Sequence, residues 1–404
     1  MRPFTSTMPF ADALKIALDA TTPITRTETI AIGEADGRVV ARDIVSSLDV
    51  PPFDRSAMDG YAVRSADCSA PAAALRVIGR VFTGDVFPGK VGPGECVEIA
   101  TGAPMPNGAD AVVMVEETTR TTEGLPSEAA RVQLSASAKE GQNIGRRAAD
   151  IAKDAIVVSR GDVLTPSRVG AVAAVGIRQI DVFEKPSVAI VSTGNEVVAP
   201  GLRLPPGHIY DINRFTLDAV SRRHGGRPVA LASPADSIEQ LDRVLDAAVA
   251  YDLIVFSGGS SVGDRDLVRD VIGARGTILF HGIAVKPGKP TAFAVIGSSL
   301  FLGMPGNPTS CLSNAYILLI PVLRKLAGLP AWEPRTVTVP LARRIASTTD
   351  RHQFYTVRLV NGQAEPAFKG SGDITSMANA DGYIEIPANT NAIDAGASVR
   401  VTFF

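Results

Sequence analysis

Short apolar runs alternate with amphipathic segments between residues 187 and 326 of the chain. Leu253–Phe256 is an unbroken apolar run, which favours a strand buried on both faces. Residues 237–251 repeat apolar side chains at helical spacing and favour an amphipathic helix. The alternation predicts a doubly wound α/β unit over residues 181–329.

The same pattern predicts the other elements of this unit. Strands are expected at 188–191, 229–232, 253–256, 278–284, 291–296 and 300–303, and helices at 215–224, at 237–251, from about 267, and at 308–326. Asn307 and Pro308 are expected to be the N-cap and first residue of the last helix. Pro321 is expected to kink that helix, because proline lacks a backbone N–H.

The remainder of the chain predicts mostly β structure after a short helix at 8–20. Residues 75–145 contain short β runs between glycine, proline and asparagine turns, and residues 335–404 alternate apolar and polar side chains. The chain is therefore expected to combine the α/β unit with two mostly-β N-terminal domains and a C-terminal β-barrel or sandwich. The predicted domain ranges are 1–49 with 146–180, an inserted domain at 50–145, 181–329 and 330–404.

Composition narrows the class of protein. The 404 residues carry a net charge of −2, with 45% hydrophobic and 20% charged residues, as in a soluble globular protein. Nothing points to nucleic acid or a membrane surface, and no apolar stretch reaches the roughly 20 residues needed to span a bilayer. The N-terminus does not read as a signal peptide. Three cysteines without close pairing favour a reducing compartment, so we expect a cytoplasmic protein.

Five polar loops lie beside the predicted strands. They are STGNE (192–196), YDINR (210–214), GGSSVGDRD (258–266), KPGKP (286–290) and GMPGNPTS (303–310). In an α/β fold such loops converge on one edge of the sheet, so we expect a ligand site there. The alternative interpretation is a set of unrelated strand-to-helix turns in which aspartates cap helices.

The loops offer three kinds of chemistry. Hydroxyls and backbone amides suited to phosphate or a pterin edge come from Ser192, Thr193, Gly194, Gly258, Gly259, Ser260 and Ser261. Hard oxygen ligands suited to Mg²⁺ come from Glu196, Asp211, Asp264 and Asp266. Lys286 and Lys289, with Ser310 in a helix first turn whose N–H groups are expected to be free, could hold a tetrahedral oxyanion. Exposed, solvated lysines are the alternative for that pair.

Several long motifs, in order along the chain, carry a family resemblance. They are PPFDRSAMDGYAV (51–63), ATGAPMPNGADAVV (100–113), STGNE, GGSSVGDRD, FHGIAVKPGKP (280–290), GMPGNPTS and GSGDITSMANADGYIEIP (370–387). Together they resemble the molybdopterin molybdenumtransferase family, which includes bacterial molybdenum-insertion enzymes and related domains of gephyrin. The α/β unit alone also resembles the molybdopterin adenylyltransferases, and the regions 21–180 and 335–404 separate the two.

The resemblance implies a reaction and an assembly. Adenylylated molybdopterin and molybdate would react with the help of Mg²⁺, the phosphoanhydride would be cleaved, and molybdenum would enter the dithiolene as AMP leaves. The subunits would form an elongated homodimer whose site is shared between chains. The adenylyltransferase and apo-molybdoenzymes are possible docking partners, and the composition favours neither nucleic acid nor a membrane.

The resemblance also implies roles for individual residues. The implied catalytic residues are Asp59, Thr101, Asp150, Glu196, Asp211 and Asp266, the first two acting in trans. Ser261 would contact the pterin. The implied molybdate set is Lys286, Lys289 and Ser310, and further binding residues are Pro305, Asn307, Pro308, Arg351 and Ser376. The chain departs from the family pattern at Ala149, Ile212, Ser260 and Gln353, but the lysines and key acids are present, which implies an active enzyme.

Two other functions compete with the insertase. Adenylylation of molybdopterin by the same fold would consume ATP. A non-catalytic carrier or scaffold would bind partners through its surface. Crowded acids and lysines on one sheet edge weigh against the scaffold, because like charges repel unless a ligand or metal is bound.

Overall fold

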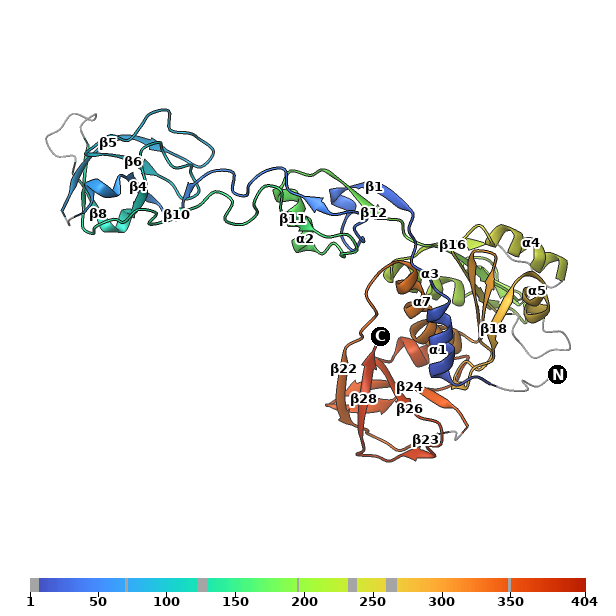
Figure 1. Ribbon diagram of the computed structural model, residues 1–404. Coiled ribbons are helices and arrows are strands. Elements are labelled where there is room, and N and C mark those ends of the chain that lie inside the picture. The colour runs from blue at the N-terminus through green and yellow to red at the C-terminus, as the bar shows by residue number, and fades with distance from the viewer. Residues whose placement is uncertain are drawn as a thin grey trace. The chain divides into compact units, whose positions relative to one another are not determined.

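A computed structural model describes residues 7–69, 72–121, 130–194, 196–231, 238–258, 267–347 and 350–404 (Figure 1). The chain forms two compact units. The larger contains the N-terminal residues up to Glu28, Gly37–Val39 and Asp181–Phe404, and the smaller contains Thr29–Asp36 and Val40–Ile180. Two of the boundaries fall within strands β1 (Thr27–Ala31) and β12 (Gln179–Phe183).

A six-stranded sheet is the centre of the larger unit. Its strands, in spatial order, are β16 (Arg227–Leu231), β13 (Ser187–Ser192), β17 (Leu253–Ser257), β21 (Ser299–Met304), β20 (Ala292–Ile296) and β18 (Thr277–His281). The first four are parallel, whereas β20 is antiparallel to both of its neighbours. The sheet is therefore mixed. A two-residue turn between paired Ile296 and Ser299 forces β20 and β21 to run in opposite directions.

Both faces of this sheet are buried. Val188 and Ile190 of β13 belong to one hydrophobic cluster, and Ala189 and Val191 belong to another. The first cluster includes residues of α1 (Phe10–Asp19), α3 (Asn213–Arg223), α6 (Pro308–Asn314) and α7 (Ile320–Leu326), and the second includes residues of α4 (Ile238–Ala248) and α5 (Leu267–Arg275). The unbroken apolar run at β17 is fully buried, as its sequence predicted.

The last long helix differs in detail from the prediction. A π-helical segment, Ala315–Leu319, separates α6 from α7 and directly precedes the turn that contains Pro321. A widened turn of this kind accommodates a residue that cannot donate a backbone hydrogen bond. Asn307 occupies the N-cap position with Pro308 after it, but its side chain makes no capping bond and instead donates to Ser371 Oγ at 3.1 Å.

The first helix belongs to the larger unit, and not with the residues up to 49 as its place in the sequence suggested. Ala13 and Ala17 of α1 are completely buried in the core that also holds β18 and α7. Alanines four residues apart let a helix backbone approach its neighbours closely. Spatial packing therefore overrides chain order here.

The C-terminal residues form a second sheet in the larger unit. Its order is β19 (Val285–Lys286), β24 (His352–Val360), β26 (Gly382–Ile386), β28 (Ser398–Phe403) and β22 (Thr336–Pro340), with β25 (Gln363–Pro366) on β24. A bridge also joins Leu341 to Ala364. The remaining elements are β23 (Ile345–Ala346), which pairs with β27 (Ala392–Ile393), and α8 (Thr375–Ala378). Strand β19 comes from the KPGKP segment, so this loop joins the C-terminal sheet.

The smaller unit is mostly β structure, as predicted for 75–145. Its main sheet has the order β7 (Ala111–Met114), β4 (Gly60–Val63), β6 (Glu95–Ile99), β5 (Ala74–Val81), β9 (Arg131–Leu134) and β8 (Thr118–Thr121). Two short pairs are β3 (Arg55–Ser56) with β10 (Ile144–Gly145) and β2 (Ile44–Val45) with β11 (Ile156–Val158). Helix α2 (Pro166–Ala174) begins at Thr165, which accepts the backbone N–H of Arg168.

Two further findings concern the cysteines and the helices. The three cysteines are free and buried. In the part of the chain that the structure describes, no helix is long and apolar enough to cross a membrane.

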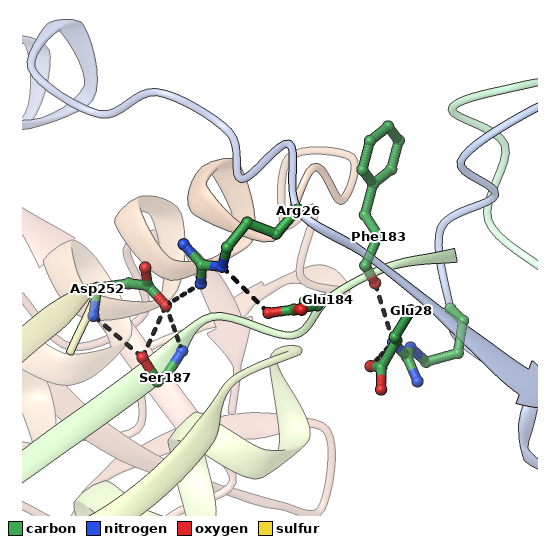
Figure 2. Close-up of polar contacts among 7 residues, drawn as sticks. Arg26, Glu28, Phe183, Glu184, Ser187 and Asp252 are labelled. Carbon is green, nitrogen blue, oxygen red and sulfur yellow. Dashed lines mark hydrogen bonds and ion pairs between the residues drawn. The ribbon is translucent and has the colours of Figure 1, made fainter. Parts of the chain in front are cut away.

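A polar network anchors β13 and β17 at the start of the central sheet (Figure 2). Asp252 Oδ2 accepts hydrogen bonds from the Ser187 backbone N–H (2.8 Å), from Ser187 Oγ (2.7 Å) and from Arg26 (2.8 Å). Arg26 also pairs with Glu184 at 3.1 Å. Burial opposes the charge on Asp252, but these hydrogen bonds outweigh burial and hold the pKa of Asp252 below its ordinary value.

His224 should make the larger unit sensitive to acid. The ring is buried, lies edge-on against Trp332, and has no partner for Nδ1 among the described residues. Burial, together with Arg324 and Arg223, lowers the pKa of His224 from 6.5 to about 4. Protonation therefore favours the unfolded chain, and stability present above pH 6.5 should fall by roughly 2–3 kcal/mol towards pH 4.

Urea unfolding followed by Trp332 fluorescence between pH 7 and 4 measures this loss. Trp332 is the single tryptophan of the chain. His224→Phe retains an aromatic ring beside Trp332 without the titration, so its midpoint should change less over the same range. An equal acid shift in both proteins would contradict the assignment.

Candidate functional site

A cavity of about 490 Å³ lies at the edge of the central sheet where β13, β17 and β21 end. Strand β20 begins at the same edge, because it is antiparallel to β21. Each of the five predicted loops contributes to the lining. The lining comes from 192–197 without 195, from 209–213, from 257–258, from Pro290 and from 305–310 without 309.

Asp211 links two of these loops. Strands β14 (Val197–Val198) and β15 (Ile209–Tyr210) pair in parallel and bring Asp211 beside Ser192. Asp211 Oδ1 accepts hydrogen bonds from Ser192 Oγ (3.1 Å) and from the Arg214 backbone N–H at the start of α3 (3.0 Å). One carboxylate oxygen thus stabilises a helix terminus. Within the described residues, Oδ2 makes no hydrogen bond, and it is the oxygen left for a ligand.

Glu196 is the second described acid of the cavity. Its carboxylate folds over Gly194, where an added Cβ would lie 2.7 Å from Glu196 Oε2. Carboxylate oxygens of this kind suit a hard cation. The described residues contain no group of three or more histidine, cysteine, aspartate or glutamate side chains placed to hold a metal. Five predicted residues lie outside the described residues: Gly259, Ser260, Ser261, Asp264 and Asp266.

Gly258 fits against the first loop so closely that a side chain is excluded. Its φ is +100°, and an added Cβ would lie 2.4 Å from the backbone oxygen of Thr193. Thr193 in turn donates its N–H to Ser257 O at 2.9 Å. Two loops of the cavity are thus locked together at this point.

Gly258→Ala should displace both loops and lower kcat/KM of the reaction that the family resemblance implies by roughly 10²-fold, because small misplacements of a positioned site have effects of that size. Gly273→Ala is the matched control. Gly273 lies in helix α5, and the nearest atom to an added Cβ would be 3.6 Å away. Steady-state kinetics of the two variants compares them. Equal activity would show that the loop geometry at Gly258 is not required.

Asn213 is a site residue that the sequence analysis did not single out. It is 7% exposed, and its Nδ2 donates to Ser257 Oγ and to Gly306 O, both at 2.7 Å. Asn213 therefore ties the end of β17 to the loop before α6. A signal was present, because Asn213 shares the buried face of α3 with Leu217 and Val220. A polar side chain on a buried helix face needs partners.

The predicted anion-binding residues lie on two sides of this region. Ser310 is buried in the first turn of α6 and lines the cavity. Lys286 and Lys289 are half-buried and do not line it. Lys286 pairs with Gln353 where β19 lies beside β24. This pairing brings a C-terminal strand to the KPGKP segment (286–290), here called the lysine loop.

The expectation of free N–H groups at the start of α6 is wrong for Thr309. Its N–H donates to Ser371 O at 3.0 Å, and its hydroxyl donates to Asp373 O at 2.7 Å. The C-terminal segment therefore occupies part of this helix terminus. The sequence could not show this, because the partners are more than sixty positions apart.

The two C-terminal candidates have different surroundings. Arg351 pairs with Asp350 at 3.1 Å, and the next residue, His352, donates its N–H to Ala284 O, two residues before Lys286. Ser376 is completely buried, and its Oγ accepts the Lys369 N–H at 2.9 Å. Arg351 thus lies near the lysine loop, whereas Ser376 stabilises a turn.

In the smaller unit, two of the three predicted residues are in contact. Asp59 Oδ1 accepts the Thr101 N–H at 2.8 Å, and both residues are exposed. Asp150 is exposed, and its N–H donates to Val50 O. Asp54, from the same long motif as Asp59, accepts bonds from the Arg147 N–H and from Arg146, which hold the pKa of Asp54 below its usual range.

Comparisons with known proteins agree with this architecture. Family models match along the chain: the MoeA N-terminal region (domain I and II) at 8–176, a probable molybdopterin binding domain at 189–325, and the MoeA C-terminal region (domain IV) at 338–404. The chain therefore belongs to the MoeA family of molybdopterin molybdenumtransferases. It is a transferase of molybdenum cofactor biosynthesis, as its motifs predicted.

Individual relatives cover nearly the whole chain. A molybdopterin molybdenumtransferase of Haemophilus influenzae is 34% identical over 94% of each chain. Molybdopterin molybdenumtransferase 2 of Mycobacterium tuberculosis is 34% identical over 92% of this chain and 94% of its own. A molybdopterin biosynthesis MoeA protein of Pyrococcus horikoshii matches in structure with a TM-score of 0.84 and 37% identity, over 98% of this chain and 99% of its own.

Proposed function

We propose that this protein transfers molybdenum from molybdate to adenylylated molybdopterin and releases AMP. The observation that carries the proposal is the cavity at the sheet edge, which Asp211, Glu196 and Ser310 line together with the polar loop 192–194. The names of the relatives support the substrate class. A molybdate oxygen attacks the adenylyl phosphorus, the phosphoanhydride bond breaks, and molybdopterin phosphate leaves, which joins AMP to molybdate through that oxygen. The two dithiolene thiols then displace AMP and one oxide from molybdenum, and the oxide leaves as water with the thiol protons.

Asp211 and Glu196 would hold Mg²⁺ in this cavity. The donor set fits a hard cation, because Asp211 Oδ2 has no partner among the described residues and Glu196 lines the same space. When bound, Mg²⁺ would supply positive charge to the pyrophosphate. The chain itself would orient the substrate: Asn213 fixes the loops that line the cavity, and polar groups of 192–194 would face the polar edges of the pterin.

Lys286, Lys289 and Ser310 would bind the molybdate anion. Two cations spaced by proline and glycine suit a tetrahedral dianion. The neighbouring C-terminal strand, which carries His352 and Gln353, would bring Arg351 to the same anion. In this assignment the C-terminal sheet contributes to substrate binding and is not an appended module.

We further propose a homodimer whose active site is shared, in the cytoplasm. Large apolar side chains are exposed beside the cavity: Leu202 is 61% and Phe215 is 51% exposed. In the proposed dimer these two side chains would lie in the interface, where the partner subunit removes them from water. Asp59, Thr101 and Asp150 of one subunit would then act on substrate in the other. The adenylyltransferase and apo-molybdoenzymes would be its docking partners.

Mixed dimers test the shared site. Asp59→Asn and Asp211→Asn homodimers should each lose most of their activity, and co-expressed mixed dimers should regain activity, because one of their two sites contains both aspartates. No recovery in mixed dimers that are shown to form would place both aspartates in the same chain's site.

A substrate test separates the competing functions. AMP release from adenylylated molybdopterin that requires molybdate supports the insertase. Formation of adenylylated molybdopterin from molybdopterin and ATP would favour the adenylyltransferase. Tight binding of the adenylylated pterin without turnover would favour a carrier.

A further inference from the structure

A buried asparagine lies directly beneath the lysine loop. Asn314 is the last residue of α6 and is completely buried. Its Nδ2 donates to Gly288 O at 3.0 Å and also to Thr291 Oγ1. Thr291 Oγ1 donates to the same Gly288 oxygen at 2.8 Å. The carbonyl at the centre of the KPGKP segment is therefore held by two donors.

The loop backbone is shaped around this amide. Gly288 has φ +110°, and an added Cβ would lie 2.5 Å from both Nδ2 and Oδ1 of Asn314. The other end of the loop is fixed by Lys289 O, which accepts the N–H groups of Ile283 (3.0 Å) and Thr291 (2.9 Å). Lys286 and Lys289 thus stand on either side of a carbonyl that Asn314 anchors.

In this position, one polar atom of the Asn314 side chain is left without a hydrogen bond. Its Oδ1 is buried and has no hydrogen-bond partner among the described residues. An apolar side chain of similar size would fill the same space without that penalty. Simple packing therefore does not account for an asparagine here, whereas a requirement for its N–H donors does.

The helix connects this anchor to the cavity. Ser310 lies four residues before Asn314, so both lie on one face of α6. Ser310 lines the cavity, and Asn314 holds the loop that carries the lysines. The spacing between the hydroxyl and the ammonium groups therefore depends on the Asn314 bond.

We propose that Asn314 is a positioning residue that sets the lysine loop for oxyanion binding. The inference rests on the proposed molybdate role of Lys286 and Lys289. Asn314 acts through these lysines and does not contact the anion. Its loss should therefore weaken molybdate binding selectively, while the adenylylated pterin, bound in the main cavity, is affected little.

Kinetics of Asn314→Leu and Asn314→Ala test the proposal. Leucine fills the space of the asparagine but has no hydrogen-bond donors, whereas alanine leaves the space empty and also lacks the donors. At least one of the two variants should fold. Each should raise the KM for molybdate by about tenfold or more, as expected for a lost hydrogen bond at a positioned loop. The KM for adenylylated molybdopterin should change less than about threefold. Ser313→Ala is the matched control, because Ser313 is buried in the same helix but contacts Met377.

The lysines supply the decisive comparison. Lys286→Ala with Lys289→Ala should raise the molybdate KM, and adding Asn314→Leu to that variant should raise it less than about threefold further, since coupled residues are not additive. An unchanged molybdate KM in the double-lysine variant would overturn the lysine assignment and this inference with it. A raised KM there, with normal molybdate KM in a folded Asn314→Leu protein, would overturn the inference alone.

Discussion

Replacing Asp211 by asparagine should lower the rate of AMP release by roughly 10²–10³-fold, the range seen when a charge-stabilising group is removed from an active site. Asparagine retains the Oδ1 acceptor that Ser192 and the Arg214 N–H use, and asparagine is itself a good helix cap. The fold should therefore persist, and only the charge facing the cavity is lost. The loss should appear in kcat measured with saturating adenylylated molybdopterin and Mg²⁺.

Asp218→Asn is the control for this experiment. Asp218 lies on the same helix α3 and forms an exposed pair with Arg222 at 2.7 Å. It should retain activity close to that of the unchanged protein. If Asp211→Asn were as active as Asp218→Asn, the cavity acid would have no part in the reaction.

Asp252→Ala should have the largest effect on stability, about 2–4 kcal/mol, because it removes a half-buried carboxylate that accepts hydrogen bonds from three donors. The Ser187 N–H and hydroxyl would lose their acceptor at the start of β13, as Figure 2 shows. The urea midpoint of the transition reported by Trp332 measures the change. A midpoint within error of the unchanged protein would contradict this role.

The pH dependence of Asp252 has a definite sign. The pKa of Asp252 is lower in the folded chain than in the unfolded chain. Its contribution to the stability of the fold is therefore present above the ordinary aspartate pKa and is lost as pH falls through the folded pKa. The Asp252→Ala protein should lack that part of the loss of stability on acidification. Asp19→Ala is the control, since Asp19 pairs with Lys15 on an exposed helix surface and should leave the midpoint nearly unchanged.

Local patterns predicted the elements that build the cavity. The apolar run at Leu253–Phe256 marked a buried central strand, and loops after neighbouring strands were expected to meet. The structure brings residues of all five loops to one cavity. The convergence of the loops could be predicted because parallel strands place their carboxyl ends at one edge of a sheet, whatever the details of packing.

Long-range contacts were not accessible from local patterns. The pairing of Lys286 with Gln353 and the bond from Thr309 to Ser371 join positions more than sixty residues apart. The place of α1 likewise depends on which core receives Ala13 and Ala17. Hydrophobic periodicity shows that a face is buried, but it does not show against what.

The most direct test of the proposed reaction is its stoichiometry. Purified protein, adenylylated molybdopterin, Mg²⁺ and radiolabelled molybdate are mixed, and AMP and pterin-bound molybdenum are both counted. One reaction at one site predicts one molybdenum transferred for each AMP released, and no AMP without molybdate. AMP released without molybdenum transfer, or molybdenum transferred without AMP, would contradict the account.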